Sequence, residues 1–313
     1  MPIGRALRQC AQVGVLSILG LPLVAAAQPD TRQDQEQCSK AKTAKECQAA
    51  LPACGRTLAA IEQAPSAPNF DVRVGRVLSE LAGCERAVGN YPAAEGHYRH
   101  ALVVRQRLHG PEHTEVATNL QFLADVLSDL GKFEEAERLC RQALEMRQKL
   151  LGAEQPEVAE SIDHLASVLA DQGRYEQAER LVRTALEMRQ RLLGGKHPDV
   201  ARSLNGLARV LNDQAKYEEA ETLFRQALEM RQKLLAAQHP DVAESLDGLA
   251  SVLADQGRYE QAAGMKRQAL EMRQRLLGDK HPDVALSLNN LAWVLTKQAN
   301  TRRPRRSFGM PWR

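Results

Sequence analysis

The chain repeats itself every 42 residues, and this period constrains its fold more than any other feature. Written in rows of 42, residues 71–299 align without a gap, with repeats starting at residues 71, 113, 155, 197 and 239 and a half repeat starting at 281. A period of about 20–50 residues is typical of arrays in which each unit packs against its neighbours. We therefore expect one elongated array and not separate globular domains.

The repeats are not equivalent to one another. Residues 156–197 match residues 240–281 at 33 of 42 positions, but they match the adjoining residues 198–239 at only 25. The better match lies two repeats away, which indicates that a unit of 84 residues was duplicated.

Each repeat has the pattern of two amphipathic helices. In the repeat that starts at residue 197, apolar side chains follow one helical face from Pro198 to about Ala215. A second helix starts at Tyr217 and carries its own apolar stripe. Aromatic residues make up only 4% of the chain, which is rich in the strong helix formers Ala, Leu, Glu, Gln and Arg. The sequence therefore predicts an all-α protein built from helix pairs.

Within this pattern, individual residues resemble a known family. They are the pair Leu207-Ala208, the series Tyr217, Ala220, Phe224 and Ala227, and the joint His197-Pro198-Asp199-Val200-Ala201. These residues are similar to tetratricopeptide repeats (TPR), specifically the longer type of kinesin light chains, over about residues 71–300. The resemblance implies a right-handed α-solenoid of antiparallel helix pairs that binds a protein or peptide and catalyses no reaction.

By this resemblance, the first helix of each repeat lines a concave groove, and its side chains outside the core bind the ligand. The positions are acidic in repeats three and five, basic and amide-bearing in repeat four, and mixed on the last helix: Glu160, Asp163, Glu244, Asp247, Arg202, Asn205, Arg209, Asn212, Asn289, Asn290 and Trp293. Guanidinium groups suit carboxylates, and amides suit a peptide backbone. The other interpretation is that Arg202 and Arg209 only neutralise the neighbouring acids.

The stretch Asn289-Asn290-Leu291-Ala292 fully matches the one with which kinesin light chains recognise the backbone of extended peptides. Asp163 and Asp247 depart from that pattern, so the resemblance does not fix the ligand class. Trp293 is expected either to anchor a ligand or to pack against Phe308 and Trp312 of the basic tail, residues 300–313.

The last repeat loses its pattern at Asn300, where a second helix should begin. Two interpretations stay open. The helix that starts at residue 281 caps the array, as solenoids require, or the chain is the sensor or adaptor arm of a larger signalling protein whose effector domain is lost.

The first 27 residues have the layout of a signal peptide: Arg5 and Arg8, an apolar run from Val13, and Ala25-Ala26-Ala27 at the expected cleavage site. The run of about 15 apolar residues is shorter than the roughly 20 that span a bilayer. We therefore expect an exported protein that is not inserted in the membrane after cleavage. Residues 28–70 are expected to form a disordered start, a short helix and a linker.

An exported protein permits disulfides among the cysteines that follow the leader. Cys38, Cys47, Cys54 and Cys84 could form two bridges in three pairings, which the sequence does not distinguish. Cys140 occupies a core position of its repeat and is expected to be a buried thiol.

The remaining patterns favour no other function class. The net charge is +3, but two arginines of the leader and five of the tail contribute +7, so the body between them carries −4. The repeats also lack a basic stripe that would bind nucleic acid. The cysteines lack zinc-finger spacing, and there is neither a Gly-rich phosphate loop nor a nucleophile elbow. Ser161, Asp163 and His164 are the residue types of a catalytic triad, but they lie within one turn of one helix and therefore do not indicate a hydrolase site. The sequence therefore predicts no metal, no cofactor and no enzymatic activity.

Overall fold

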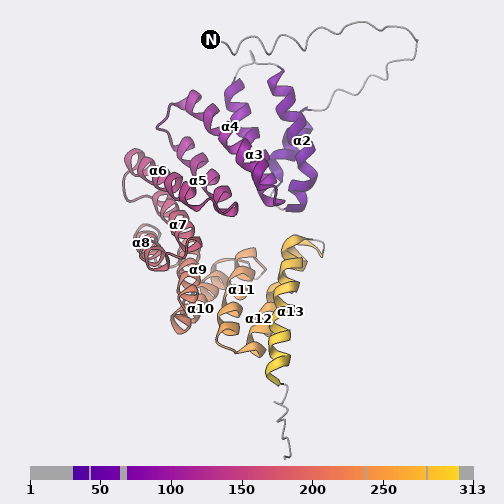
Figure 1. The fold of residues 1–313 in the computed structure, drawn as a ribbon, viewed down its shortest axis with the longest axis vertical. Helices are drawn as coiled ribbons and strands as arrows, with labels where there is room; N and C mark the ends of the chain where they lie inside the picture. Colours follow the sequence, from indigo (N-terminus) through magenta and orange to yellow (C-terminus); the bar gives the residue numbers. More distant parts are fainter. Residues whose placement is uncertain (1–30, 42–43, 64–68, 237, 280, 303–313) are drawn as a thin grey trace, which may run out of the picture. The chain divides into compact units, whose positions relative to one another are not determined.

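A computed structural model describes residues 31–41, 44–63, 69–236, 238–279 and 281–302. The predicted signal peptide, the Pro-rich linker at 64–68 and most of the basic tail lie outside these residues. The described part forms thirteen α-helices (Figure 1): α1 Thr31–Lys40, α2 Ala44–Glu62, α3 Phe70–Ala87, α4 Tyr91–His109, α5 Thr114–Asp129, α6 Phe133–Leu151, α7 Pro156–Asp171, α8 Tyr175–Leu193, α9 Pro198–Asp213, α10 Tyr217–Leu234, α11 Pro240–Asp255, α12 Tyr259–Leu277 and α13 Pro282–Arg302.

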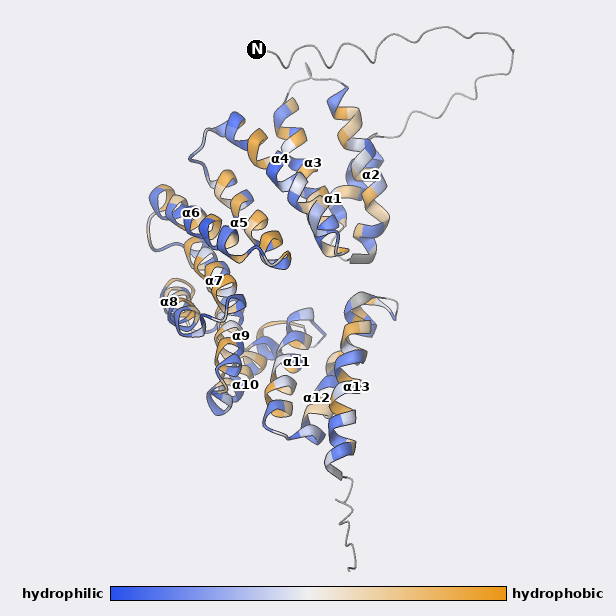
Figure 2. Ribbon diagram, in the orientation of Figure 1, coloured by the Kyte–Doolittle hydropathy of each residue, from blue (hydrophilic) through white to orange (hydrophobic). Residues whose placement is uncertain are grey.

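Successive helices pack against each other in pairs, so the predicted all-α solenoid is confirmed. Each repeat contributes one pair, such as α7 with α8 or α9 with α10, and the second helix of one repeat also contacts the first helix of the next. Apolar and polar residues lie on different faces of these helices (Figure 2). One continuous core of buried Leu, Val and Ala side chains runs from α3 to α13. None of the helices in the described ranges is both long and apolar enough to span a membrane.

The N-terminal segment differs from the expectation of a disordered start and a short helix. It forms two helices, α1 and α2, and α2 packs on α3 of the first repeat. A disulfide joins Cys38 of α1 to Cys54 of α2, and both cysteines lie in a small core with Ala50 and Leu81. The bridge and this core stabilise a pair of helices that the Gln-rich composition does not suggest.

Histidine side chains cap the first helices of the repeats. The Nδ1 atoms of His113, His197, His239 and His281 each accept a hydrogen bond from the backbone N–H two residues later, at 3.1–3.2 Å. An acceptor at this position satisfies one of the N–H groups that a helix leaves unpaired at its start. These histidines, spaced 42 or 84 residues apart, therefore belong to the joints between repeats, as the sequence predicts for His197.

The first helices of repeats two to five, α5, α7, α9 and α11, are each followed by a residue in the left-handed conformation. Gly131, Gly173 and Gly257 have φ angles between 73° and 78°, and Ala215 adopts φ 59° at the equivalent position of repeat four. Glycine takes this conformation without the steric cost of a Cβ. Repeat four therefore keeps the turn geometry of its neighbours although it lacks the glycine.

A column of arginines connects each repeat to the next. It consists of residues 42 positions apart on the second helices: Arg105, Arg147, Arg189, Arg231 and Arg273. Each guanidinium donates to a side chain 14 residues later on the following first helix, namely Asn119, Ser161, Ser203, Ser245 and Ser287. Arg147, Arg189 and Arg231 are almost completely buried. We call these five residues the arginine ladder.

Candidate functional site: a groove along α7, α9 and α11

The first helices of repeats two to five, together with the end of α3, line a groove with a volume of about 660 Å³. Side chains of α5, α7, α9 and α11 form most of its walls. Val182 of α8 and Phe224 of α10 reach its floor from the second helices, next to Val168 and Val210. The groove therefore has an apolar floor between polar walls.

Two glycines shape this floor: Gly206 leaves space beside Val182, and Gly248 makes room for the ring of Phe224. At equivalent repeat positions, the Tyr98 ring stacks on Phe122, Val182 lies beside Gly206, and Phe224 lies against Gly248. The residues at the same two positions between the first and second of these pairs are Cys140 and His164. A Cβ at Gly206 would lie 3.8 Å from Val182, whereas a Cβ at Gly248 would overlap the ring of Phe224, with Cζ at 2.7 Å. The groove floor thus lies where repeats four and five lack the large side chain that repeats two and three carry.

The structure brings together seven of the eleven predicted groove residues. Those that line the groove are Asp163, Arg202, Asn205, Arg209, Asn212, Glu244 and Asp247. Glu160 instead lies outside it, with its carboxylate 3.7 Å from the Arg147 guanidinium. Asn289, Asn290 and Trp293 on α13 do not line it either.

Asp163 is engaged by the arginine ladder. Its Oδ2 accepts a hydrogen bond from the Arg189 guanidinium, which also donates to Ser203. Burial raises the pKa of the Asp163 carboxyl, and the nearby Arg189 charge opposes that rise. The other carboxylate oxygen, Oδ1, is buried and has no hydrogen-bond partner among the described residues. Asp163 therefore stabilises the joint between repeats while one of its oxygens stays unpaired.

The two asparagines of α9 are also partly engaged. Asn205 is buried, and its Oδ1 accepts a hydrogen bond from Ser245 Oγ at 3.2 Å. Asn212 Nδ2 donates to Asp255 Oδ2 at 2.9 Å, and within the described chain its Oδ1 is buried without a partner. Both asparagines are thus engaged in contacts between repeats and are less available to a peptide backbone than the sequence suggests.

Lys266 replaces an apolar core residue without loosening the end of the array. Its Nζ lies 2.8 Å from Asp247 Oδ1 and 3.1 Å from Ser251 Oγ, and the side chain is buried. A buried ammonium is tolerated when charged and polar partners surround it. Asp247 is consequently committed to Lys266 on the groove wall.

The three arginines that line the groove differ in their pairing. Arg86 binds Asp129 at 2.6 Å and Asp125 at 3.4 Å, and Arg202 forms an ion pair with Asp199. Arg209 is exposed and has no hydrogen bond or ion pair through its side chain within the described ranges, although its positive charge opposes the rise that burial causes in the pKa of the Asp213 carboxyl. Arg209 is therefore the lining cation that is available to an external anion.

Several lining residues were missed by the sequence analysis. Arg86, Asp125, His164 and Asp171 enter the groove through contacts between repeats, such as His164 Nδ1 to Asp125 Oδ1 at 2.8 Å and Ser128 Oγ to Asp171 at 2.7 Å. Partners about 40 residues apart in sequence leave no periodic signal within one helix. One signal was present in the sequence: an aspartate recurs every 42 residues at the end of the first helix, at Asp129, Asp171, Asp213 and Asp255.

Ser161, Asp163 and His164, the residue types of a catalytic triad, do not form a triad in the structure. Ser161 Oγ bonds the Arg147 guanidinium at 2.7 Å, and His164 binds Asp125. In the described part of the chain, no group of three or more His, Cys, Asp and Glu side chains is arranged to hold a metal ion.

Large apolar side chains are exposed on α13, at the end of the array. Leu286, Leu288 and Trp293 are about half exposed, and Lys297 Nζ lies 5.5 Å from the centre of the Trp293 ring. Leu204 and Leu246, which occupy the position of Leu288 in earlier repeats, are buried. At this position α13 thus exposes an apolar side chain that its counterparts bury.

Comparisons with known proteins agree with this architecture. No curated protein sequence matches the chain. The solved structure of BtubC (BKLC) from P. vanneervenii is similar at 24% identity and a TM-score of 0.58, over 75% of this chain and 94% of that one. A putative kinesin light chain from Podosopora anserina is similar at 22% identity and a TM-score of 0.51, over 65% and 98%. A Rap protein in complex with Competence and Sporulation Factor is similar at 14% identity and a TM-score of 0.55, over 86% and 75%.

At these identities the likeness to solved structures shows the fold alone. The family assignment comes from the sequence model of the tetratricopeptide repeat, which matches residues 73–149, 115–166, 157–233, 203–275 and 241–303. Proteins built from such repeats are generally scaffolds for interactions with other proteins and are not themselves catalysts. The overlapping matches extend over most of the described residues, and the chain belongs to the tetratricopeptide repeat family.

Proposed function

We propose that this protein is a non-catalytic scaffold that binds an extended segment of a partner protein in the groove along α7, α9 and α11. The observation that carries the proposal is the combination of Arg209, which forms no ion pair within the described ranges, with the apolar floor that Gly206 leaves uncovered beside it. Pockets that bind ligands typically combine an apolar surface with a few placed polar groups. The Rap neighbour, solved with a bound factor, supports a binding role for this architecture.

The groove charges define the expected ligand. A carboxylate of the partner faces Arg209, and an apolar side chain enters the floor over Val182 and Phe224. Asp171, whose carboxylate accepts a hydrogen bond from Ser128 of α5 and has no ion pair within the described ranges, carries negative charge at this side of the groove, so a basic residue of the ligand fits there.

We further propose that the mature protein acts outside the cytoplasm, because its leader has signal-peptide layout and its N-terminal helices are joined by a disulfide. Disulfides persist mainly in oxidising compartments. The partner should therefore be an exported or surface protein.

A charge swap tests the groove. Peptides are selected on the full chain from a displayed random library, and their affinities are measured by fluorescence anisotropy. We expect Arg209→Glu to weaken binding of an acidic peptide about tenfold or more, because a hydrogen bond to a charged group contributes roughly 1.5–3 kcal/mol.

The matched control is Arg180→Glu, an exposed arginine of α8 that does not line the groove. It should leave the affinity unchanged, and replacing the peptide's acidic residue by Lys should restore binding to Arg209→Glu. Equal losses in both variants would show that Arg209 is not a specific contact.

A further inference from the structure

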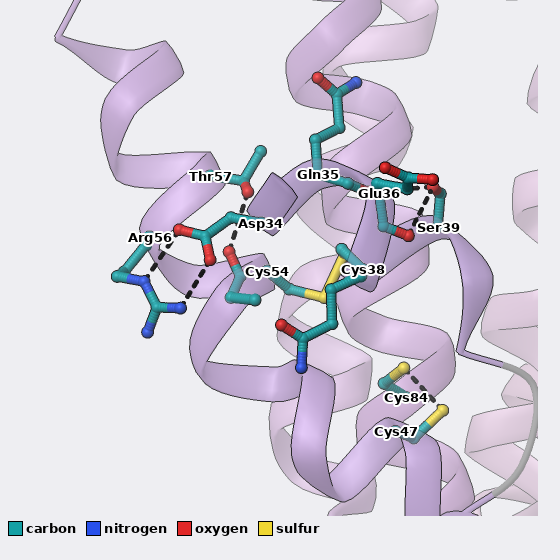
Figure 3. Close-up of a disulfide and its surroundings, with 12 residues drawn as sticks. Asp34, Gln35, Glu36, Cys38, Ser39, Cys47, Cys54, Arg56, Thr57 and Cys84 are labelled. Atoms are coloured by element: carbon teal, nitrogen blue, oxygen red, sulfur yellow. Dashed lines mark hydrogen bonds and ion pairs between the residues drawn. A yellow bond between two sulfur atoms is a disulfide. The ribbon is translucent and has the colours of Figure 1, made fainter. Parts of the chain in front are cut away.

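Two cysteines that the structure leaves unbonded lie against each other in the N-terminal region. Cys47 belongs to α2 and Cys84 to α3, and their sulfur atoms are 2.6 Å apart (Figure 3). Both side chains are buried, each with 3% of its surface exposed. This separation is only about 0.5 Å longer than a covalent S–S bond of roughly 2.05 Å. Little movement is needed to join the two residues.

The existing disulfide does not connect the N-terminal helices to the solenoid. Cys38 and Cys54 link α1 to α2, so that bridge stays within the N-terminal helix pair. The side chains that hold this pair on the first repeat form only small apolar cores, one around Ala50 and Leu81 and another around Ile61 and Leu78. The Cys47–Cys84 pair lies across the junction between the helix pair and the repeat.

We propose that Cys47 and Cys84 form a second disulfide in the oxidised protein, which covalently fastens the α1–α2 helix pair to the first repeat as an N-terminal cap. Terminal repeats of a solenoid expose one face of their core and need such a cap. The first repeat is the most divergent of the five, so a covalent joint here secures the end at which repeat packing is least regular. With both bridges formed, α1, α2 and α3 become one cross-linked unit.

The oxidant is a disulfide-bearing thiol carrier, either oxidised glutathione or a protein disulfide, which acts by thiol–disulfide exchange. One cysteine thiolate attacks the carrier disulfide and releases one carrier thiol. The second cysteine then attacks the mixed disulfide and releases the other carrier thiol. The Cys47–Cys84 bond forms, the carrier S–S bond breaks, and two electrons and two protons pass to the two carrier thiols.

Burial, together with the adjacent Cys47, raises the pKa of the Cys84 thiol to about 12. Little thiolate is therefore present at neutral pH in the folded, reduced protein, and the thiolate is the form that reacts. Oxidation should be fast while the chain folds, and slow once α2 is docked on α3.

Counting free thiols tests this inference. The full chain, recovered from the oxidising compartment or refolded with oxidised glutathione, is denatured and alkylated without reduction, and the labelled cysteines are mapped by mass spectrometry. We expect label on Cys140, which is buried and unbonded, and on Cys10 if the leader is retained. None is expected on Cys47 or Cys84.

The variant Cys84→Ser gives opposite results under the two possibilities. If the second bridge forms, losing Cys84 frees Cys47, and the number of labelled cysteines rises by one. If the bridge does not form, the variant loses a labelled cysteine and the number falls by one. In the variant Cys38→Ser/Cys54→Ser, the tryptic peptide with Cys47 should stay linked to the one with Cys84. Label on both Cys47 and Cys84 in the oxidised wild type, or a link from Cys47 to Cys38 or Cys54, would overturn the proposal.

Discussion

Replacing Arg189 by methionine is expected to lower the free energy of unfolding by about 3–5 kcal/mol, the typical loss when one partner of a buried ion pair is removed. The Arg189 side chain is only 2% exposed and is bonded to both Asp163 and Ser203. Without it, the Asp163 carboxylate lies at the joint with neither oxygen paired, since Oδ1 already lacks a partner within the described chain. The variant should therefore weaken the contact of α8 with α9.

Urea unfolding followed by circular dichroism measures this loss, and amide hydrogen exchange locates it in α8 and α9. Arg183→Met is the matched control on the same helix. Arg183 is exposed and pairs with Glu179 on the surface, so its loss should cost no more than about 1 kcal/mol. Adding Asp163→Leu to Arg189→Met should recover part of the stability. Similar effects of Arg189→Met and Arg183→Met would contradict a structural role for the arginine ladder.

Replacing the two groove glycines, Gly206 and Gly248, by alanine should change the free energy of unfolding in opposite directions. Glycine inside a helix is less stable than alanine by roughly 0.5–1 kcal/mol. Gly206→Ala adds a Cβ at an ordinary contact distance from Val182, so we expect it to stabilise the protein. Gly248→Ala places a Cβ into the buried ring of Phe224, and overpacking of this kind typically costs about 1–3 kcal/mol.

The same unfolding assay distinguishes the two substitutions, and each serves as control for the other because they lie 42 residues apart at one repeat position. In the background of Phe224→Val, which copies the Val182 pairing, Gly248→Ala should no longer destabilise the protein, because the overlapping ring is gone. A stabilising Gly248→Ala would show that Phe224 moves aside freely and does not form a fixed floor.

Local signals in the sequence predicted the helices well. The apolar stripe from Pro198 and the joint at His197 correspond to α9, Pro198–Asp213, with the histidine as its cap. These features depend on contacts within a few residues along the chain. Hydrophobic periodicity and capping chemistry report such contacts directly.

The groove was only partly predictable from the sequence, because contacts between repeats decide which side chains line it and which of them are free to bind a ligand. Asp163 and Asn205 have the pattern of exposed residues on a first helix, yet Arg189 and Ser245 engage them from neighbouring helices. The link from Arg189 to Ser203 crosses a loop, so a single-helix pattern does not reveal it. Gly206 carries no side chain to suggest a function, although the missing side chain creates the space.

The N-terminal helix pair was missed for a similar reason. Its stability depends on the Cys38–Cys54 bridge and on packing against α3, and the pairing of cysteines cannot be read from sequence alone. The Gln-rich helix α1 is too polar and too short to be stable by itself.

Filling the groove without disturbing the fold tests its role in binding most directly. Gly206→His copies the residue that repeat three carries at the equivalent position, His164, and places a large polar side chain on the floor. Gly206→Ala is the control that changes the backbone preference but leaves the groove open. The measurement is the affinity of each variant for the peptide selected on the wild-type protein, with circular dichroism to confirm equal helix content. We expect Gly206→Ala to bind like the wild type and Gly206→His to bind at least about tenfold more weakly, a loss of about 1.4 kcal/mol. Unchanged affinity in a fully folded Gly206→His variant would contradict binding in this groove.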